Sequence, residues 1–324
     1  MIDIDHPCSF HGMPVFTLPG PGDDSPPPAT PPAADSVAWR LECGWEGPEF
    51  AAVWQHFLET VDPARVRALV IGPWWRDDYS PLAPVVERIA SDAARFPALR
   101  ALFLADVVGE ECEVSWLQMC DITPVLQAFP RLEELVVRGG GSGLNKETLE
   151  LAPVRHEALK ALRFESGGLP GHIVRAVGAC AFPALERLEL WLGSQWYSGD
   201  ATVADMAPLL SGGGFPRLRH LGLQNSEIQD EIAVAVASAP VVAQLEFLAL
   251  SMGTLSDAGG LALLEGQPLT HLSGLDLHHH YLGDEVMERF RQLSERHDVH
   301  VDLSEVDDWD PDDEDEPRYV AVSE

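Results

Sequence analysis

The chain has 324 residues, and its 21 Lys and Arg against 52 Asp and Glu give a formal net charge of −31 at pH 7. This charge argues against nonspecific binding to nucleic acid and to anionic membranes, because both interactions need a cationic protein surface. Apolar residues make up 46% of the chain, which is enough to form a hydrophobic core and argues against global disorder.

The start of the chain and its cysteines favour a cytoplasmic protein. Residues 1–6 contain neither the basic nor the apolar region of a secretory signal. The longest uncharged apolar stretch, residues 232–245, is too short to span a bilayer. The five cysteines are an odd number and include no CxxC pair. This pattern is typical of reduced thiols and not of a disulfide framework.

Three segments precede the main pattern of the chain. Residues 1–18 contain an apolar stretch, residues 10–16, which we expect to dock onto the first folded unit. Residues 19–36 hold seven prolines, a composition typical of a linker, and a ligand for a polyproline-binding module is the less favoured alternative. Residues 37–60 combine strand-like alternation with apolar residues at helical spacing, and we interpret them as an N-terminal cap.

One apolar pattern recurs through residues 61–303, namely leucine, two residues, leucine, one residue, leucine. Successive copies begin 33, 33, 27, 26, 33, 27 and 27 residues apart. The copies are Val66-Leu69-Ile71, Leu99-Leu102-Leu104, Leu132-Leu135-Val137, Leu159-Leu162-Phe164, Leu185-Leu188-Leu190, Leu218-Leu221-Leu223, Leu245-Leu248-Leu250 and Leu272-Leu275-Leu277, with a truncated Val299-Val301. Such a period indicates a solenoid of about eight or nine repeats, in which stacking buries what one repeat cannot bury alone.

These repeats resemble those of leucine-rich repeat proteins. Segments such as residues 281–290 are similar to the second halves of ribonuclease-inhibitor-type repeats, in which a full α-helix lies on the convex side. The resemblance implies an α/β solenoid, or horseshoe, with a parallel β-sheet on the concave side and α-helices on the convex side. The ninth repeat position is Ser226, Gly253 and His280, so the chain departs from the asparagine ladder usual in that subtype.

The two ends of the chain carry a second resemblance. The HGMPVF stretch at residues 11–16 and the YVAVSE end at residues 319–324 are similar to those of an uncharacterised family of bacterial leucine-rich repeat proteins. That resemblance covers nearly the whole chain, and it implies no particular activity.

A helix stop precedes four of the expected strands. The stops are Phe96-Pro97, Phe129-Pro130, Phe182-Pro183 and Phe215-Pro216. Proline ends the preceding helix because its ring is incompatible with the helical backbone before it. We expect each phenylalanine to fill the core between helix and sheet.

Residues 304–324 are predicted to form an acidic tail and a terminal strand. Nine acids lie within residues 305–316, a block typical of a solvated segment and, as an alternative, of an internal competitor for a basic site. Residues 319–322 return to alternating apolar character, so we expect them to pair with the last strand.

Two motifs could indicate a ligand-binding or catalytic site. Gly139–Gly143 follow a strand as a phosphate-binding loop would, but no Gly-Lys-Ser/Thr comes next, which favours a plain strand-to-helix connection. The run His278–His280, with His271 and Asp284 nearby, suggests a metal site. Adjacent strand residues face opposite sides, however, which favours polar residues on the surface of a repeat. The sequence has no GxSxG or HExxH motif, and we predict no catalytic residues, metal or cofactor.

Loops that follow three of the strands are one candidate surface for partner binding. Three repeats carry about six extra residues there, in residues 72–84, 105–122 and 191–204, and these loops hold five of the nine tryptophans. The loop aromatics are Trp74, Trp75, Tyr79, Trp116, Trp191, Trp196 and Tyr197. Aromatics on loops over a rigid scaffold are typical interface anchors, and burial inside the loops is an equally favoured alternative. We expect at least one ring of Trp74 and Trp75 to be exposed.

The concave sheet is the second candidate surface. Its 24 expected outward positions hold six basic and six acidic residues, so their charges sum to zero. The basic residues are Arg67, Arg100, Lys160, Arg163, Arg187 and Arg219, and the acidic ones are Glu133, Glu134, Glu186, Glu189, Glu246 and Asp276. We expect cross-strand pairs such as Arg100 with Glu133 and Lys160 with Glu186. The face is either a solvated, charge-balanced surface or a recognition surface of alternating sign, and its partner need not be basic.

These features predict a noncatalytic scaffold that binds a protein or peptide through the concave sheet and the aromatic-bearing loops. Fold-level analogy supplies much of this prediction, and we expect neither nucleic acid nor membrane as a partner. One alternative, suggested by the family resemblance, is an accessory subunit that presents a substrate to a modifying enzyme encoded by a neighbouring gene. The other is a metal-dependent enzyme that uses His278, His280 and nearby acids.

Overall fold

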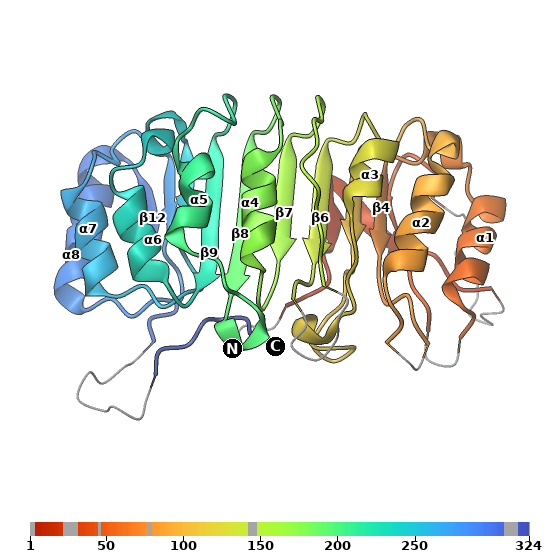
Figure 1. Cartoon of the computed structure of the whole chain (residues 1–324), viewed down its shortest axis with the longest axis horizontal. Coiled ribbons are helices and arrows are strands. Elements are labelled where there is room, and N and C mark those ends of the chain that lie inside the picture. Colours follow the sequence, from red (N-terminus) through yellow and green to blue (C-terminus); the bar gives the residue numbers. More distant parts are fainter. Residues whose placement is uncertain are drawn as a thin grey trace.

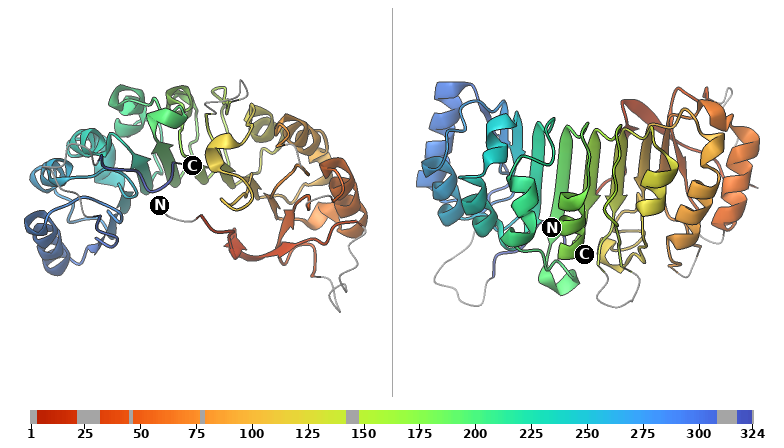
Figure 2. Two further views of the ribbon diagram at one scale, coloured as in Figure 1. Left: turned by 90° about the horizontal axis from the view of Figure 1, so that it is seen from below. Right: turned by 45° about the horizontal axis from the view of Figure 1, so that its top comes forward.

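The computed structural model describes residues 4–21, 32–44, 47–76, 79–141, 148–307 and 317–323. In this part of the chain, twelve strands form one sheet whose spatial order is the order of the sequence. Neighbouring strands are parallel from β2 to β12, and β1 pairs antiparallel with β2. The sheet lines the inner side of an arch and the helices cover the outer side (Figures 1 and 2).

The strands are β1 (Ser9–Phe10), β2 (Met13–Thr17), β3 (Ala38–Leu41), β4 (Ala68–Ile71), β5 (Ala101–Leu104), β6 (Glu134–Arg138), β7 (Ala161–Glu165), β8 (Arg187–Gly193), β9 (His220–Ser226), β10 (Phe247–Ala249), β11 (Gly274–Asp276) and β12 (His300–Asp302). The α-helices are α1 (Phe50–Thr60), α2 (Ala83–Ser91), α3 (Thr123–Ala128), α4 (Gly171–Ala179), α5 (Val203–Leu210), α6 (Gln229–Val236), α7 (Asp257–Glu265) and α8 (Asp284–His297). None of these helices has both the length and the apolar character needed to cross a bilayer.

The leucines of the repeated pattern lie where the pattern places them. The middle leucines are in register across the sheet, Leu69 opposite Leu102 and so on to Leu275 opposite Val301. The pattern leucines are buried between sheet and helices, and burying each leucine side chain stabilises the fold by about 2 kcal/mol. The chain is therefore an α/β leucine-rich repeat solenoid, as predicted.

The phenylalanines of the four helix stops form part of this core. Phe96, Phe129, Phe182 and Phe215 are all buried, and three of them are in stacked pairs, Phe96 with Phe57 and Phe182 with Phe215. The expectation that each ring fills the space between helix and sheet is confirmed.

β1 and β2 form an N-terminal hairpin. β2 pairs with β3 at the first edge of the sheet, and the hairpin lies over the concave face (Figure 2). His11 and Gly12, the two residues between the strands, both have positive φ. This is the backbone of a type I′ turn, whose twist matches that of the flanking strands. Phe10 of β1 contacts Phe103 of β5, with 5.9 Å between ring centroids, so the hairpin reaches beyond the first repeats.

The C-terminal segment takes a different course from the expected one. We predicted that residues 319–322 pair with the last strand, but no such pairing is formed in the described residues. The segment instead runs back along the loops that follow the strands, where Ala321 N donates to Met252 O over 2.8 Å.

Candidate interaction surface on the concave sheet

The N-terminal hairpin divides the concave face into a covered half and an open half. Phe10 and Met13 form an apolar cluster with Val70, Phe103 and Val136, which project from the concave side of β4, β5 and β6. The His11 ring adds a polar contact, with its Nδ1 2.8 Å from Glu134 Oε2. The apolar part of the concave face of β3 to β6 is therefore an internal interface.

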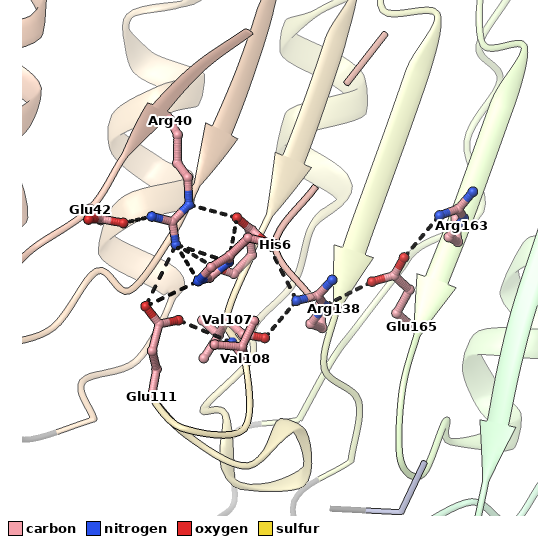
Figure 3. Close-up of polar contacts among 10 residues, drawn as sticks. His6, Arg40, Glu42, Val107, Val108, Glu111, Arg138, Arg163 and Glu165 are labelled. Atoms are coloured by element: carbon pink, nitrogen blue, oxygen red, sulfur yellow. Dashed lines mark hydrogen bonds and ion pairs between the residues drawn. The ribbon is translucent and has the colours of Figure 1, made fainter. Parts of the chain in front are cut away.

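Beside this cluster, charged side chains of alternating sign run across the sheet. We call this series the charge ladder, and its members are Arg40, Asp106, Arg138, Glu165, Arg163 and Glu189. Figure 3 shows the part of the charge ladder from Arg40 to Arg163. Each contact joins a guanidinium to a carboxylate on the same or a nearby repeat. The separations from Arg40 to Asp106, Asp106 to Arg138, Arg138 to Glu165 and Glu165 to Arg163 are 2.7, 3.4, 2.9 and 3.1 Å.

The centre of the charge ladder is buried, so its charges must be paired to be tolerated. Asp106 is 0% and Arg138 is 3% exposed. Asp106 Oδ2 also lies 3.1 Å from His6 Nδ1, and Arg138 donates to Val107 O over 2.7 Å while its guanidinium lies over the Phe103 ring. Asp106 and Arg138 lie outside the concave positions predicted from sequence, and their ion pair is a buried contact within the fold.

Glu189 of β8 marks the boundary between the covered and the open half. Burial alone would raise the pKa of Glu189, but the hydrogen bond from His220 and the charges of Arg163 and Arg187 outweigh it and lower this pKa to about 2. Burial likewise opposes the charge of Arg163, whose pKa is nevertheless raised by Glu189 and Glu165. Both groups are therefore charged throughout the neutral pH range.

The lowered pKa of Glu189 predicts a pH-dependent contribution to stability. A carboxylate with a depressed folded-state pKa stabilises the protein above its unfolded pKa of 4.5, and this stabilisation is lost as pH falls toward about 2. Glu189→Gln should therefore reduce the free energy of unfolding at pH 6 by roughly 2 kcal/mol, with the difference from wild type shrinking between pH 4.5 and 2. Urea unfolding of both proteins between pH 6 and pH 2 measures this difference in the free energy of unfolding. Glu186→Gln, at an exposed position of the same repeat, is the control, and an equal effect of both variants would contradict the prediction.

The open half of the concave face extends from β8 to β12. Its central row runs from Glu189 to Gly222, Ala249, Asp276 and Asp302 in register. Gly222 and Ala249 are both buried, and the Gln224 side chain covers Gly222, where a Cβ would lie 2.6 Å from Gln224 Oε1.

Aromatic side chains stand beside this row. The rings of His220 and Phe247 stack with centroids 4.6 Å apart and planes 3° from parallel. A Cβ at Gly274 would lie 2.5 Å from the Phe247 ring, so glycine is required for the ring to rest there. Trp191 extends from β8 and is partly buried. Aromatic faces next to carboxylates can bind an apolar segment that carries a cation.

Asp276, His278 and Asp302 form a cluster at the far end of the open half. One potential ligand atom from each lies within 4.8 Å of the others. Nδ1 of His278 is 2.7 Å from Asp276 Oδ1, and this hydrogen bond raises the pKa of His278. Nitrogen and carboxylate donors of this kind could hold a divalent cation. Sequence reasoning missed Asp302, because only the parallel register places it beside Asp276.

The other two histidines of the run contact different partners. His279 Nε2 lies 3.3 Å from Tyr319 O. His280 is fully buried, with Nε2 3.3 Å from Leu303 O, and its Nδ1 accepts from Leu282 N. His280 thus occupies the buried position where the resemblance would place an asparagine.

The structure separates the predicted loop aromatics into buried and exposed groups. Trp74 and Trp75 are both buried, so the expectation that at least one of these rings is exposed is wrong. The rings pack edge to face 4.7 Å apart, and Trp74 Nε1 donates to Ser80 O. They line a groove of about 350 Å³ between α1 and α2.

The remaining loop aromatics are more accessible. Tyr79, Trp116 and Trp196 are exposed, Trp196 to 87%, whereas Trp191 and Tyr197 are partly buried. Trp116 and Trp196 lie in short 3-10 helices, Val114–Trp116 and Gln195–Tyr197, which belong to two of the long connections after strands.

Of the two predicted cross-strand pairs, the structure forms one. Arg100 Nε lies 3.7 Å from Glu133 Oε1. Lys160 Nζ contacts Glu133 at 2.7 Å and is not paired with Glu186 in the described residues, because Glu133 lies closer on the preceding repeat. The predicted residues Glu186, Arg187 and Arg219 are exposed at the margin of the open half.

The glycine run considered as a phosphate loop is only partly described, since residues 142 and 143 lie outside the described residues. Gly140 adjoins the next repeat so closely that a Cβ would lie 2.1 Å from Ser166 Oγ. Gly139 has φ of +113°. Close packing and backbone conformation account for these two glycines, which agrees with a plain connection.

Comparisons with known proteins found similarity to solved structures. No family model and no curated protein sequence matches the chain. A crystal structure of a Bacteroides fragilis protein from a structural genomics consortium aligns with 25% identity and a TM-score of 0.78, covering 89% of this chain and 78% of that one. A crystal structure of an internalin from Listeria monocytogenes aligns at 14% identity with a TM-score of 0.30, covering 76% of this chain and 82% of that chain.

Proposed function

We propose that this protein is a noncatalytic interaction scaffold that binds a protein or peptide through the open half of its concave sheet. The leucine-rich repeat fold is a scaffold type that commonly mediates protein–protein interaction, which is a fold-level argument. The observation that carries the proposal is the open half itself, where Trp191 and the stacked His220 and Phe247 adjoin Glu189 and Asp276.

The chemistry of the open half favours an extended segment with apolar and cationic side chains. Apolar groups can rest on Phe247 and Trp191, and a Lys or Arg can reach Asp276 or Asp302. The exposed Trp116 and Trp196, with Tyr197, supply further anchors on the edge of the solenoid. Trp74 and Trp75 no longer belong to the proposed site, because both are buried.

We also propose a cytoplasmic location, and the cysteines support both this location and the noncatalytic role. All five are free thiols, as expected in a reducing compartment. Burial raises the pKa of Cys43 to about 11 and that of Cys112 to about 12. These two thiols therefore stay protonated at neutral pH and are poor nucleophiles.

We further infer that the repeats are of the ribonuclease-inhibitor-like subtype, as in the bacterial family that the chain ends resemble. The proposed organisation is a docking segment (1–18), a proline-rich linker (19–36), an N-terminal cap (37–60), the repeats (61–303) and an acidic C-terminal region (304–324).

Affinity purification from the native cell, followed by mass spectrometry, tests the proposed site. Trp191→Ala/Phe247→Ala should lower recovery of the partner at least 10-fold, because aromatic anchors at the centre of an interface often contribute 2 kcal/mol or more each. Val234→Ala, at an exposed apolar position on α6, is the matched control and should retain the partner. Circular dichroism verifies that each variant is folded. Full recovery by the double variant would contradict the site.

A further inference from the structure

The C-terminal segment, residues 317–323, lies extended along the loops that follow the strands (Figure 1). It contacts the repeats of β11, β10, β9 and β7, in the reverse of their order in the sequence. Tyr319 contacts the residues after β11, Ala321 those after β10, and Val322 those at the end of β9. Ser323 packs against Gly167, after β7, where a Cβ would lie 2.4 Å from the Ser323 carbonyl oxygen.

Main-chain hydrogen bonds hold this segment. The buried Asn225 side chain binds both main-chain groups of Val322: Nδ2 donates to the carbonyl oxygen over 2.6 Å, and Oδ1 accepts from the amide over 2.9 Å. Tyr281 makes a similar pair with Tyr319, since its hydroxyl donates to the carbonyl oxygen over 3.1 Å and accepts from the amide over 2.9 Å. Two-point recognition of the backbone is typical of sites that bind extended peptides of variable sequence.

The side chains of the segment add a limited specificity. Val320, Ala321 and Val322 are buried, Ala321 completely. Arg318 Nη1 donates to Thr254 O over 2.9 Å and lies 3.3 Å from Asp230 Oδ2. The edge thus selects an arginine followed, after one residue, by small or β-branched apolar residues.

Contacts within the solenoid hold the repeat residues that bind the segment. Asn225, Met252 and His279 occupy equivalent turns of three consecutive repeats and share a left-handed backbone, with φ of +54°, +67° and +53°. Backbone hydrogen bonds between repeats hold the turns, from Asn225 N to Ser251 O and from Met252 N to His278 O. Left-handed backbone at non-glycine residues is uncommon and clusters at ligand-binding sites.

We propose that this edge is a peptide-binding groove, that residues 318–323 are its tethered intramolecular ligand, and that an extended peptide of the same chemistry on a partner protein replaces them. The groove is defined by Gly167, Asn225, Asp230, Met252, Thr254, His279 and Tyr281. The segment forms neither a helix nor a strand of the sheet in the described residues, so its release leaves the hydrogen bonds of the sheet intact. This site is separate from the concave surface, and neither proposal depends on the other.

Cleavage of the chain after folding allows peptide binding to the groove to be measured. A specific protease site placed within residues 308–316 allows the folded full-length protein to be cleaved and its tail to be removed by dilution and gel filtration. The probe is a fluorescent synthetic peptide with the sequence of residues 317–324, and fluorescence polarisation measures its binding. We expect a dissociation constant in the micromolar range for the cleaved protein. Binding to the uncleaved protein should be at least 100-fold weaker, because the tethered segment competes at high effective concentration.

Two variants assign the binding to the groove. Asn225→Ala in the cleaved protein should weaken peptide binding about 10-fold, because both hydrogen bonds to the probe's counterpart of Val322 are lost. Glu227→Gln, an exposed position in the following turn, is the control and should bind as the parent does. A probe in which the residue equivalent to Ala321 is glutamate should not bind, because that position is fully buried.

Hydrogen exchange of the uncleaved protein provides a second measurement that needs no variant. The main-chain amides of Tyr319, Ala321 and Val322 should exchange through local opening, at least 10-fold faster than amides in β9 and β10. Protection equal to that of these strands would overturn the proposal, since the segment would then be an inseparable part of the fold. Unfolding on cleavage, or cleaved and folded protein that fails to bind the probe, would overturn it as well.

Discussion

Asp106→Ala should lower the free energy of unfolding by about 3 kcal/mol, because it breaks two buried ion pairs at once. The side chain of Asp106 is fully buried between two guanidiniums, 2.7 Å from Arg40 Nε and 3.4 Å from Arg138 Nη1. Its removal leaves Arg138 with Glu165, and Arg40 with Glu42 and Glu111, which are both partly exposed. The midpoint of urea unfolding measures the change, and Asp106→Asn, which keeps the shape of the side chain, should show most of the loss.

A pair on the surface supplies the matched control for this prediction. Arg155 Nε lies 2.6 Å from Glu157 Oε1, but both side chains are mostly exposed. Exposed pairs contribute little to stability because water and salt screen them. Glu157→Ala should therefore leave the unfolding midpoint nearly unchanged. If Asp106→Ala and Glu157→Ala shifted the midpoint equally, the charge ladder would not be a buried network.

Phe10→Ala should destabilise the protein by about 3 kcal/mol, because it removes the largest side chain with which the N-terminal hairpin covers the concave sheet. Phe10 is 6% exposed and its ring contacts Phe103. We expect the hairpin to detach before the solenoid unfolds, since it shares few contacts with the helices. Amide hydrogen exchange should then rise selectively in residues 8–17, and an apolar dye should bind the uncovered Val70, Phe103 and Val136.

Ser9→Ala is the control for the hairpin, because Ser9 is the neighbouring residue of β1 and is exposed. It should change neither the exchange of residues 8–17 nor the binding of dye. Uniform loss of protection throughout the solenoid in Phe10→Ala would contradict a separately attached hairpin. Increased partner recovery by this variant would show that the hairpin also restricts access to the concave face.

Structural features that depend on one repeat and its immediate neighbour could be predicted from the sequence. The spacing of Leu99, Leu102 and Leu104 specifies one strand with three inward positions, and Phe96 before Pro97 specifies the end of the preceding helix. The pairing of Arg100 with Glu133 also followed, because the repeat length sets the register between adjacent strands.

Parts of the candidate site were not predictable in the same way. Lys160 lies between Glu133 and Glu186 in the register, and only side-chain geometry decides that it contacts Glu133. The burial of Trp74 and Trp75 depends on how a long connection folds back between α1 and α2. Spacing along the chain carries no information about such a loop, and amphipathic tryptophan suits both a buried and an exposed position.

The sequence by itself determined that this protein is a leucine-rich repeat solenoid, because periodic burial is a property of each repeat and of its immediate neighbours. Only the tertiary structure decided which surfaces remain open to a partner. His11 meets Glu134 across 123 residues, and Asn225 meets Val322 across 97. These contacts join non-repeating ends to the middle of the solenoid, where side-chain shape and hydrogen-bond geometry select the partner and no periodicity predicts it. The charge of the protein shows the same contrast. The sequence determines the net charge of −31, but only the tertiary structure shows the buried charge ladder in which basic and acidic groups alternate.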